Sequence, residues 1–215
     1  MSISKWLVLA VLSGFPLAAL PAASAANVLV FGDSLSAGYG LPQGTSWVSL
    51  LESRIAQAAP NYKVVNASIS GETAAGGTRR IAGALAQHKP AVVILELGAN
   101  DGLRGQRIET LQADLETMVR ASQQQGAKVL LVGMRLPPNY GTDYVRRFEN
   151  AFETVARKYN VAFVPFLLDG FGERYELFQS DGIHPTREAQ PLMLETIWKK
   201  LEPLLTPARS APGRR

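Results

Sequence analysis

The stretch Ala91-Val92-Val93-Ile94-Leu95-Glu96-Leu97 is almost continuously apolar and rich in β-branched residues. Strands buried on both faces of a parallel sheet have this composition, whereas half-exposed strands alternate between apolar and polar residues. Four further apolar runs accompany it, at Val28–Phe31, Lys63–Val65, Lys128–Gly133 and Val161–Pro165. The sequence therefore predicts parallel strands that are covered on both faces.

Amphipathic stretches alternate with these runs and predict helices at Trp47–Ala59, Ala74–Gln87, Ile108–Gln125, Asp143–Tyr159 and Arg187–Leu201. Within one of them the apolar residues fall at helical spacing and form a single buried stripe, made of Ile108, Leu111, Leu115, Met118 and Val119. Gly126 is expected to end that helix as its C′ residue. Strand–helix alternation with right-handed crossovers predicts the α/β class, as a doubly wound three-layer α/β/α sandwich.

Polar, glycine-bearing segments follow three of the predicted strands. These segments are Gly32-Asp33-Ser34, Ser68-Ile69-Ser70-Gly71-Glu72 and Gly98-Ala99-Asn100-Asp101-Gly102. In folds of this class ligands bind beyond the carboxyl ends of the strands. We therefore expect the three segments to meet at one edge of the sheet, within reach of the loop that carries Asp181 and His184 before the last helix.

Residues suited to nucleophilic acyl transfer occur in this set. The chain has two histidines and no cysteine, so few residues can serve as the base for a serine nucleophile. Ser34 follows a strand, and His184 lies three residues after Asp181, a carboxylate that can orient it. His88 sits at a helix end and is interpreted as structural, because a cation is favourable there. The residues alone predict a serine hydrolase.

These segments also fit other structural roles. Gly-Asp-Ser by itself also suits an ordinary turn, and Ser36 replaces the second glycine of the G-x-S-x-G elbow. Asp33 and Asp101 are expected to brace their loops by local hydrogen bonds. No metal-ligand spacing surrounds Glu72 or Glu96, so no metal or other cofactor is predicted. Gly38-Tyr39-Gly40 lacks the third glycine of a dinucleotide-binding loop.

Four blocks in a fixed order resemble the SGNH (GDSL) hydrolase family, and the resemblance covers essentially the whole mature chain. The blocks are Gly32-Asp33-Ser34-Leu35-Ser36, Ser70-Gly71-Glu72, Gly98-Ala99-Asn100-Asp101 and Asp181-x-x-His184. The resemblance implies that Ser34 is the nucleophile, His184 its base and Asp181 the orienting acid. It also implies an oxyanion hole made of the backbone N–H groups of Ser34 and Gly71 and the side-chain amide of Asn100.

Longer segments look like the exported bacterial branch of that family, the thioesterase I / protease I / lysophospholipase or arylesterase branch. They are Asn66–Glu72, Glu96–Gly105 and Arg135–Gly141. This resemblance implies a flavodoxin-like sheet of about five parallel strands and activity on fatty-acyl esters and thioesters. It also implies a mobile loop in which Leu136, Pro137, Pro138 and Tyr140 contact the acyl chain. A stiff connector is the alternative, because two prolines restrict the backbone there.

The two ends of the chain are predicted to lie outside the hydrolase domain, which is assigned to residues 26–206. Residues 1–25 have a positive start, a short apolar run and the small-residue cleavage motif Ala23-Ser24-Ala25, which predict a cleaved signal peptide and a periplasmic or secreted protein. Residues 207–215 are predicted to be a disordered basic tail. Without Lys5 and the three tail arginines, 18 basic residues face 18 acidic ones, which disfavours nucleic-acid binding.

Three functions share the predicted fold. The favoured one is an acyl ester and thioester hydrolase whose small-molecule substrate carries an acyl chain, acting as a monomer without stable membrane insertion. A carbohydrate or peptidoglycan O-acetylesterase would differ in having a small acyl pocket with sugar-stacking aromatic residues. A non-catalytic binding module would not be labelled at Ser34 by a fluorophosphonate.

Overall fold

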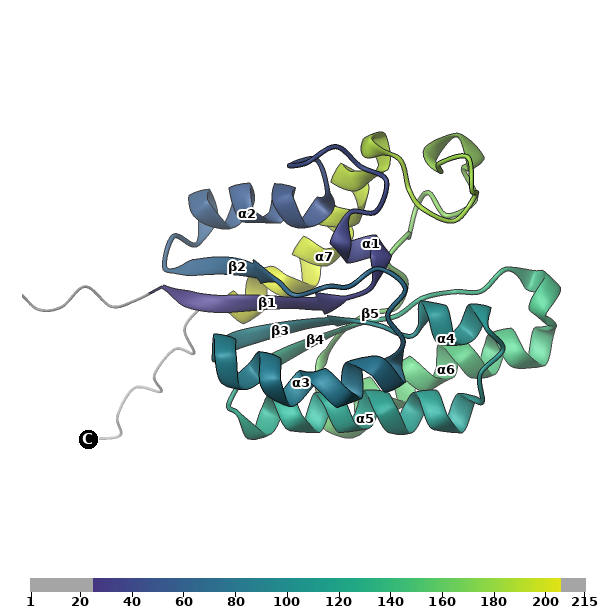
Figure 1. Cartoon of the computed structure of the whole chain (residues 1–215), viewed down its shortest axis with the longest axis horizontal. Helices are drawn as coiled ribbons and strands as arrows, with labels where there is room; N and C mark the ends of the chain where they lie inside the picture. The colour runs from purple at the N-terminus through teal and green to yellow at the C-terminus, as the bar shows by residue number, and fades with distance from the viewer. Residues whose placement is uncertain (1–24, 206–215) are drawn as a thin grey trace, which may run out of the picture.

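The computed structural model describes residues 25–205, which form one five-stranded parallel sheet with the strand order β2-β1-β3-β4-β5 (Figure 1). The strands are β1 (Ala26–Gly32), β2 (Tyr62–Asn66), β3 (Pro90–Glu96), β4 (Lys128–Val132) and β5 (Ala162–Val164). Every neighbouring pair is parallel. This order is the flavodoxin-like one, so the predicted fold class is confirmed.

Helices cover both faces of the sheet and complete the three layers (Figure 1). One face carries α1 (Ser34–Ala37), α2 (Trp47–Ala58) and α7 (Gln190–Leu205). The other carries α3 (Ala74–His88), α4 (Ala99–Leu103), α5 (Ile108–Gln124) and α6 (Thr142–Tyr159). Short 3₁₀ turns occupy Pro138–Tyr140, Tyr175–Leu177 and Arg187–Ala189. None of the helices within residues 25–205 is both long and apolar enough to cross a membrane.

Two hydrophobic cores, one on each face of the sheet, explain the continuous apolar strands. Along β1, Val28 and Val30 pack toward α2 and α7, whereas Leu29 and Phe31 pack toward the opposite helices. All four side chains are fully buried. Since successive side chains of a strand point to opposite faces, a strand between two helical layers needs apolar residues at every position.

The predicted elements match the observed ones to within a few residues, with two informative differences. The predicted helix Arg187–Leu201 begins as a 3₁₀ turn and continues beyond Pro203 to Leu205. Leu201 and Leu205 are buried in the core on that face, and this packing keeps the helix going past the proline. The short helices α1 and α4 were not predicted, because four or five residues show no hydrophobic period. The stop at Gly126 is confirmed, since Gly126 has φ +79° directly after the C-cap Gln125.

The chain reverses direction across the sheet between β1 and β3. The connection from β1 leads to β2 on one side, and the chain then returns to β3 on the other side of β1. Such a switch point leaves a crevice at the carboxyl ends of the two strands. The proposed signal peptide, apart from Ala25, and the proposed tail at residues 207–215 lie outside the described residues.

Candidate active site

Ser34, His184 and Asp181 lie in one hydrogen-bonded line at this crevice. Ser34 is the first residue of α1, directly after β1, and its Oγ lies 2.8 Å from Nε2 of His184. On the other side of the ring, Nδ1 lies 2.7 Å from Oδ2 of Asp181. The structure thus brings together three residues separated by up to 150 positions. A hydroxyl, an imidazole and a carboxylate in this arrangement can generate a serine nucleophile.

Asp181 is held as a carboxylate by its own loop. Its Oδ1 accepts the backbone N–H groups of Ile183 at 2.9 Å and of His184 at 3.0 Å. These bonds, with the one to the His184 side chain, lower the pKa of Asp181 to about 2. An ionised Asp181 favours the tautomer of His184 that carries its proton on Nδ1 and leaves Nε2 free to accept a proton.

The loop that carries His184 has little regular structure and is tied to its neighbours by hydrogen bonds. The backbone N–H of Gln179 donates to the carbonyl of His184 at 2.7 Å, and Thr186 pairs in the same way with Leu177. The Gln179 side chain donates to the carbonyls of Tyr39 and Pro185. Because Tyr39 follows α1, this glutamine links the Ser34 segment to the His184 segment.

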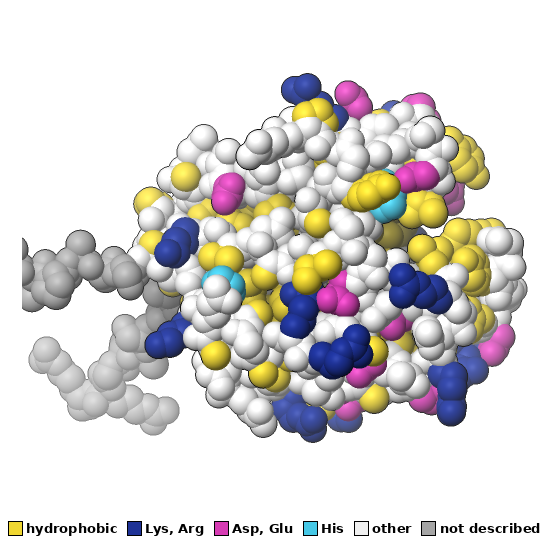
Figure 2. Space-filling model, viewed as in Figure 1, with side chains coloured by type: hydrophobic (Ala, Val, Ile, Leu, Met, Phe, Trp, Pro, Cys, Tyr) yellow, Lys and Arg dark blue, Asp and Glu magenta, His cyan; other side chains and the backbone are white. Residues whose placement is uncertain are grey.

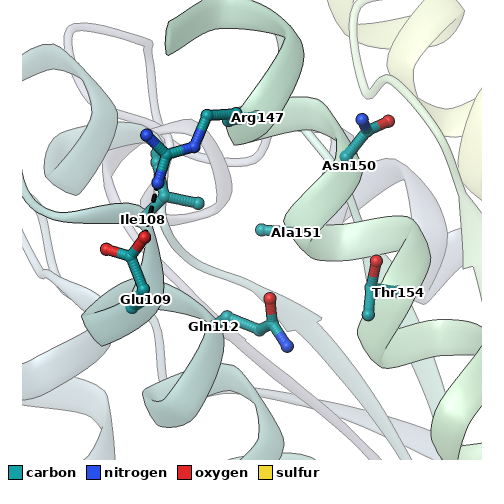
Figure 3. Close-up of a pocket in the computed structure, with 7 residues that line it drawn as sticks. All are labelled: Ile108, Glu109, Gln112, Arg147, Asn150, Ala151 and Thr154. Atoms are coloured by element: carbon teal, nitrogen blue, oxygen red, sulfur yellow. Dashed lines mark hydrogen bonds and ion pairs between the residues drawn. The ribbon is translucent and has the colours of Figure 1, made fainter.

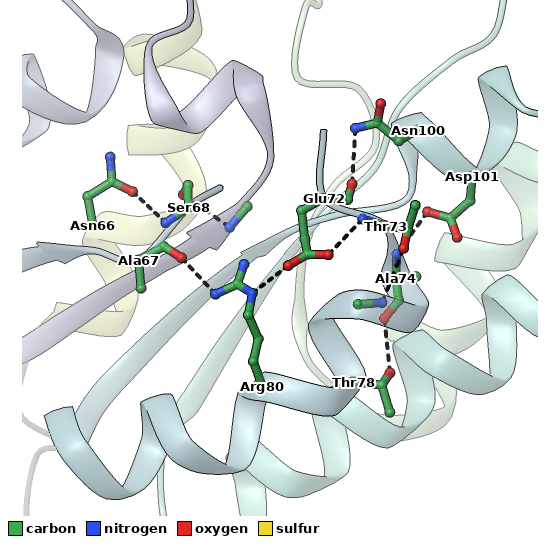
Figure 4. A network of polar contacts seen from close by, with 12 residues as sticks. Asn66, Ala67, Ser68, Glu72, Thr73, Ala74, Thr78, Arg80, Asn100 and Asp101 are labelled. Atoms are coloured by element: carbon green, nitrogen blue, oxygen red, sulfur yellow. Dashed lines mark hydrogen bonds and ion pairs between the residues drawn. The ribbon is translucent and has the colours of Figure 1, made fainter. Parts of the chain in front are cut away.

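The segment from Ala67 to Thr73 carries Gly71 and is braced from behind by Arg80 (Figure 4). The guanidinium group of Arg80 donates to the Ala67 carbonyl at 2.8 Å and to Oε2 of Glu72 at 2.6 Å. It also lies over the Phe31 ring, 3.8 Å from the ring centroid. Gly71 has φ +78°, a conformation that favours glycine.

The side-chain amide of Asn100 has two protein acceptors. Nδ2 donates to Oδ2 of Asp33 at 3.1 Å and to the backbone carbonyl of Glu72 at 3.0 Å, the second of which is visible in Figure 4. Since an amide nitrogen has two hydrogens, both are already used by these two acceptors. An oxyanion that binds Asn100 must therefore share one hydrogen with one of them. Asp101 accepts the N–H of Ala74 at 2.8 Å, and Asp33 accepts that of Leu35 at 3.0 Å. The predicted local hydrogen bond of Asp33 is therefore present, whereas Asp101 instead braces a distant segment, the start of α3.

A cavity of about 360 Å³ opens over Ser34. In Figure 2 hydrophobic side chains gather around the hollowed surface beyond the strand ends. The cavity is lined by the polar groups of the predicted site and by a set of apolar side chains. The apolar set consists of Leu35, Tyr39, Ala99, Leu103, Met134 and Ile183. This combination of convergent polar groups and an apolar wall is typical of a small-molecule site.

The four residues predicted to contact an acyl chain do not line this cavity. Leu136 is buried in the core beside Phe148, whereas Pro137 and Pro138 are exposed outside it. Tyr140 lies behind Leu103 and donates its hydroxyl to the Leu103 carbonyl at 2.9 Å. Met134 lines the cavity but was not predicted from the sequence. It lies two residues after the end of β4, and the rule that sites form beyond the carboxyl ends of strands would have indicated it.

A second hollow lies between α5 and α6 (Figure 3). Its volume is about 200 Å³, and no histidine lines it. Arg147, the cation beside it, is paired with Glu109. Within residues 25–205, no three His, Cys, Asp or Glu side chains are grouped so as to hold a metal ion. The candidate active site is therefore the cavity over Ser34.

Comparisons with known proteins point to one family. The GDSL-like Lipase/Acylhydrolase family matches residues 30–191. The esterase TesA of Pseudomonas aeruginosa is 49% identical over 183 residues, which cover 85% of this chain and 91% of that protein. Thioesterase 1/protease 1/lysophospholipase L1 of Escherichia coli K12 is 38% identical over 184 residues, covering 86% and 87%. A crystal structure of TesA superposes with a TM-score of 0.81 and 49% identity, covering 83% of this chain and 99% of that one.

Proposed function

The chain belongs to the GDSL-like lipase/acylhydrolase family, and from this premise we propose that it hydrolyses fatty-acyl esters and thioesters through an acyl-enzyme on Ser34. It is an enzyme of the serine hydrolase type with esterase or thioesterase activity, and its substrates are small-molecule esters. The observation that carries the mechanism is the continuous line from Ser34 through His184 to Asp181.

In the proposed reaction Ser34 Oγ attacks the carbonyl carbon of the ester or thioester. His184 Nε2 removes the hydroxyl proton as the new C–O bond forms, and Asp181 stabilises the resulting imidazolium. The imidazolium then gives this proton to the leaving alcohol or thiol as its bond to carbon breaks. Water, activated in the same way, releases the fatty acid and regenerates Ser34.

The developing negative charge is assigned to three donors. They are the backbone N–H groups of Ser34 and Gly71 and the side-chain amide of Asn100. Gly71 and Asn100 line the cavity with Ser34, which supports this assignment. Each such donor contributes about 10²- to 10³-fold to the rate in comparable sites.

The apolar wall of the cavity favours an acyl chain over an acetyl group. Leu103 and Met134 offer hydrophobic surface that an acetyl group would not cover. We assign the protein to the periplasm as a monomer released from a cleaved signal peptide. There a lysophospholipid or another exported ester is a more suitable substrate than acyl-CoA, which is confined to the cytoplasm.

Hydrolysis of p-nitrophenyl esters from acetyl to palmitoyl, by the mature protein and by Ser34→Ala, tests the proposal. We expect the rate to peak at medium or long chains and to be lost in the variant. Activity confined to acetyl esters would instead favour an O-acetylesterase. Full activity of Ser34→Ala would refute the nucleophile, and mass spectrometry of the exported protein tests cleavage near Ala25.

A further inference from the structure

An acidic residue ends β3, against the turn that carries the nucleophile. Glu96 is the last residue of β3, and its side chain is only 3% exposed. Its register partner on β1 is Gly32, which precedes Asp33 and Ser34. Asp33 is also buried, at 1% exposure. Two carboxyl groups therefore lie inside the protein next to Ser34, and the proposed reaction assigns a role to neither.

Glu96 holds the turn on both sides of Ser34. Its Oε2 accepts the Ser36 hydroxyl at 2.6 Å and lies 3.3 Å from the backbone N–H of Asp33. A Cβ atom on Gly32 would lie only 2.5 Å from the same oxygen, so glycine is needed there for the carboxyl group to approach. The first residue of the Gly-Asp-Ser motif must therefore be glycine because the carboxyl group of Glu96 packs against it.

Asp33 extends these contacts to the proposed oxyanion hole. Its Oδ1 accepts the N–H of Leu35 at 3.0 Å, and its Oδ2 accepts the Asn100 side-chain amide at 3.1 Å. Because Glu96 contacts the backbone of Asp33, a shift of Glu96 would move both the Ser34 hydroxyl and the Asn100 amide. A displacement of about 1 Å in such a constellation can cost about 10²-fold in rate.

The charge state of the pair agrees with a hydrogen-bonding role. Neither carboxyl group takes part in any ion pair with Lys or Arg in the described part of the chain. Burial raises the pKa of Asp33 to about 6, and burial with the nearby charge of Asp33 raises the pKa of Glu96 well above its ordinary value. Both carboxyl groups therefore hold a proton more tightly than exposed carboxyl groups do, and they act in this region through hydrogen bonds rather than through ion pairs with cations.

We propose that Glu96 is a positioning residue for the hydrolysis: as a buried hydrogen-bond acceptor it fixes the Asp33–Ser36 turn and, through Asp33, the amide of Asn100. This inference rests on the proposed function of Ser34. Glu96 does not touch the substrate, so its loss should lower kcat while leaving KM little changed. A side chain that only stabilised the fold would change the unfolding temperature without this selective loss.

The test compares Glu96→Gln with Glu96→Leu. Glutamine is neutral and keeps an oxygen acceptor for Ser36 and Asp33, whereas leucine removes it. We expect Glu96→Leu to lower kcat about 10²-fold with KM within about threefold, and Glu96→Gln to retain most of kcat. The rate of Ser34 labelling by a fluorophosphonate should fall in parallel with kcat, because labelling needs the same positioned hydroxyl.

A comparison of Ser36→Ala with Ser122→Ala provides the matched control. It also tests the proposal if Glu96→Leu fails to fold. Ser36 and Ser122 are both fully buried, but the Ser122 hydroxyl donates only to the Met118 carbonyl within α5. We expect Ser36→Ala to lower kcat about 3- to 10-fold, the value of one hydrogen bond, and Ser122→Ala to leave it unchanged.

Two results would overturn the proposal. One is a folded Glu96→Leu, or Ser36→Ala, with the kcat of the wild type. The other is a Glu96→Gln as slow as Glu96→Leu, which would mean that a charge is required rather than an acceptor. Failure of the proposed function would look different, since the wild-type protein itself would then neither hydrolyse esters nor be labelled at Ser34.

Discussion

The ring of Tyr39 lies against the imidazole of His184, with 4.5 Å between the ring centroids and 40° between the planes. Tyr39 is 53% exposed and lines the cavity over Ser34, so it forms one wall of the site as well as a support for the base. An aromatic pair of this kind contributes about 0.5–1.5 kcal/mol beyond its buried area.

Removal of the Tyr39 ring should therefore slow the reaction. Tyr39→Ala is expected to lower kcat/KM about 2- to 12-fold, the rate equivalent of that energy. Tyr39→Phe keeps the ring and should remain close to the wild type. Equal losses in the two variants would show that the hydroxyl group, and not the ring contact, is important.

Asp181 should be essential for rate but not for folding. It lies on an exposed loop, and Asp181→Asn replaces the acceptor of the His184 Nδ1 proton with an amide that can turn its NH₂ toward the ring. We expect kcat to fall by about 10²- to 10⁴-fold, with little change in the unfolding temperature. Asp169→Asn, at another exposed loop position, removes the same charge and serves as the control. A kcat near that of the control would exclude Asp181 as the orienting acid.

The apolar wall should set the preference for acyl-chain length. Met134→Phe makes one wall of the cavity bulkier, so the ratio of kcat/KM for octanoyl over acetyl esters should fall about 10-fold. Pro138→Ala tests the segment that lies outside the cavity lining. If Pro138→Ala changed this ratio and Met134→Phe did not, the 136–141 segment, and not the cavity wall at Met134, would be the part that recognises the acyl chain.

Arg80 should support activity without touching the substrate. Arg80→Met keeps an apolar side chain of similar length but removes the bonds to Ala67 and Glu72 and the guanidinium group over the Phe31 ring. Since Glu72 is partly buried, we expect a loss of about 1–3 kcal/mol in the free energy of unfolding and a lower kcat. The double variant Arg80→Met/Glu72→Gln should be more stable than Arg80→Met alone. If the loss of stability in the double variant equalled the sum of the losses in the two single variants, Arg80 and Glu72 would not be coupled.

Glu96 should make the stability of the protein depend on pH. Because burial raises the pKa of Glu96, the folded state holds this proton more tightly than the unfolded state does. The free energy of unfolding therefore falls as pH rises above about 4.5, the unfolded value, and this loss is complete above the folded-state pKa. Glu96→Gln has no such proton, so in urea unfolding its stability relative to wild type should improve as the pH rises above about 4.5. Glu52→Gln, on the exposed side of α2, matches the charge change, and an equal gain there would contradict the assignment.

Much of the fold could be predicted because its signals are local. Continuous apolar runs such as Ala91–Leu97 require cover on both faces, and the stripe from Ile108 to Val119 requires a helix against one of them. The short helices α1 and α4 could not be predicted, since their few residues owe their conformation to the strand ends that precede them. The continuation of α7 past Pro203 depends on the burial of Leu201 and Leu205, which is a property of the packed sheet.

At the site, the residue types and their spacing show which side chains are chemically able to act. A serine after a strand, few histidines and an aspartate three residues before one of them restricted the choice to Ser34, Asp181 and His184, because acyl transfer needs a nucleophile, a base and an orienting acid. The surroundings of these three residues, in contrast, depend on how the folded chain packs. The burial of Glu96 against Gly32, the two acceptors of Asn100 and the wall at Met134 all arise from contacts between distant segments. No local pattern encodes such contacts, since burial and the pKa shifts that follow from it exist only once the strands and loops have packed together.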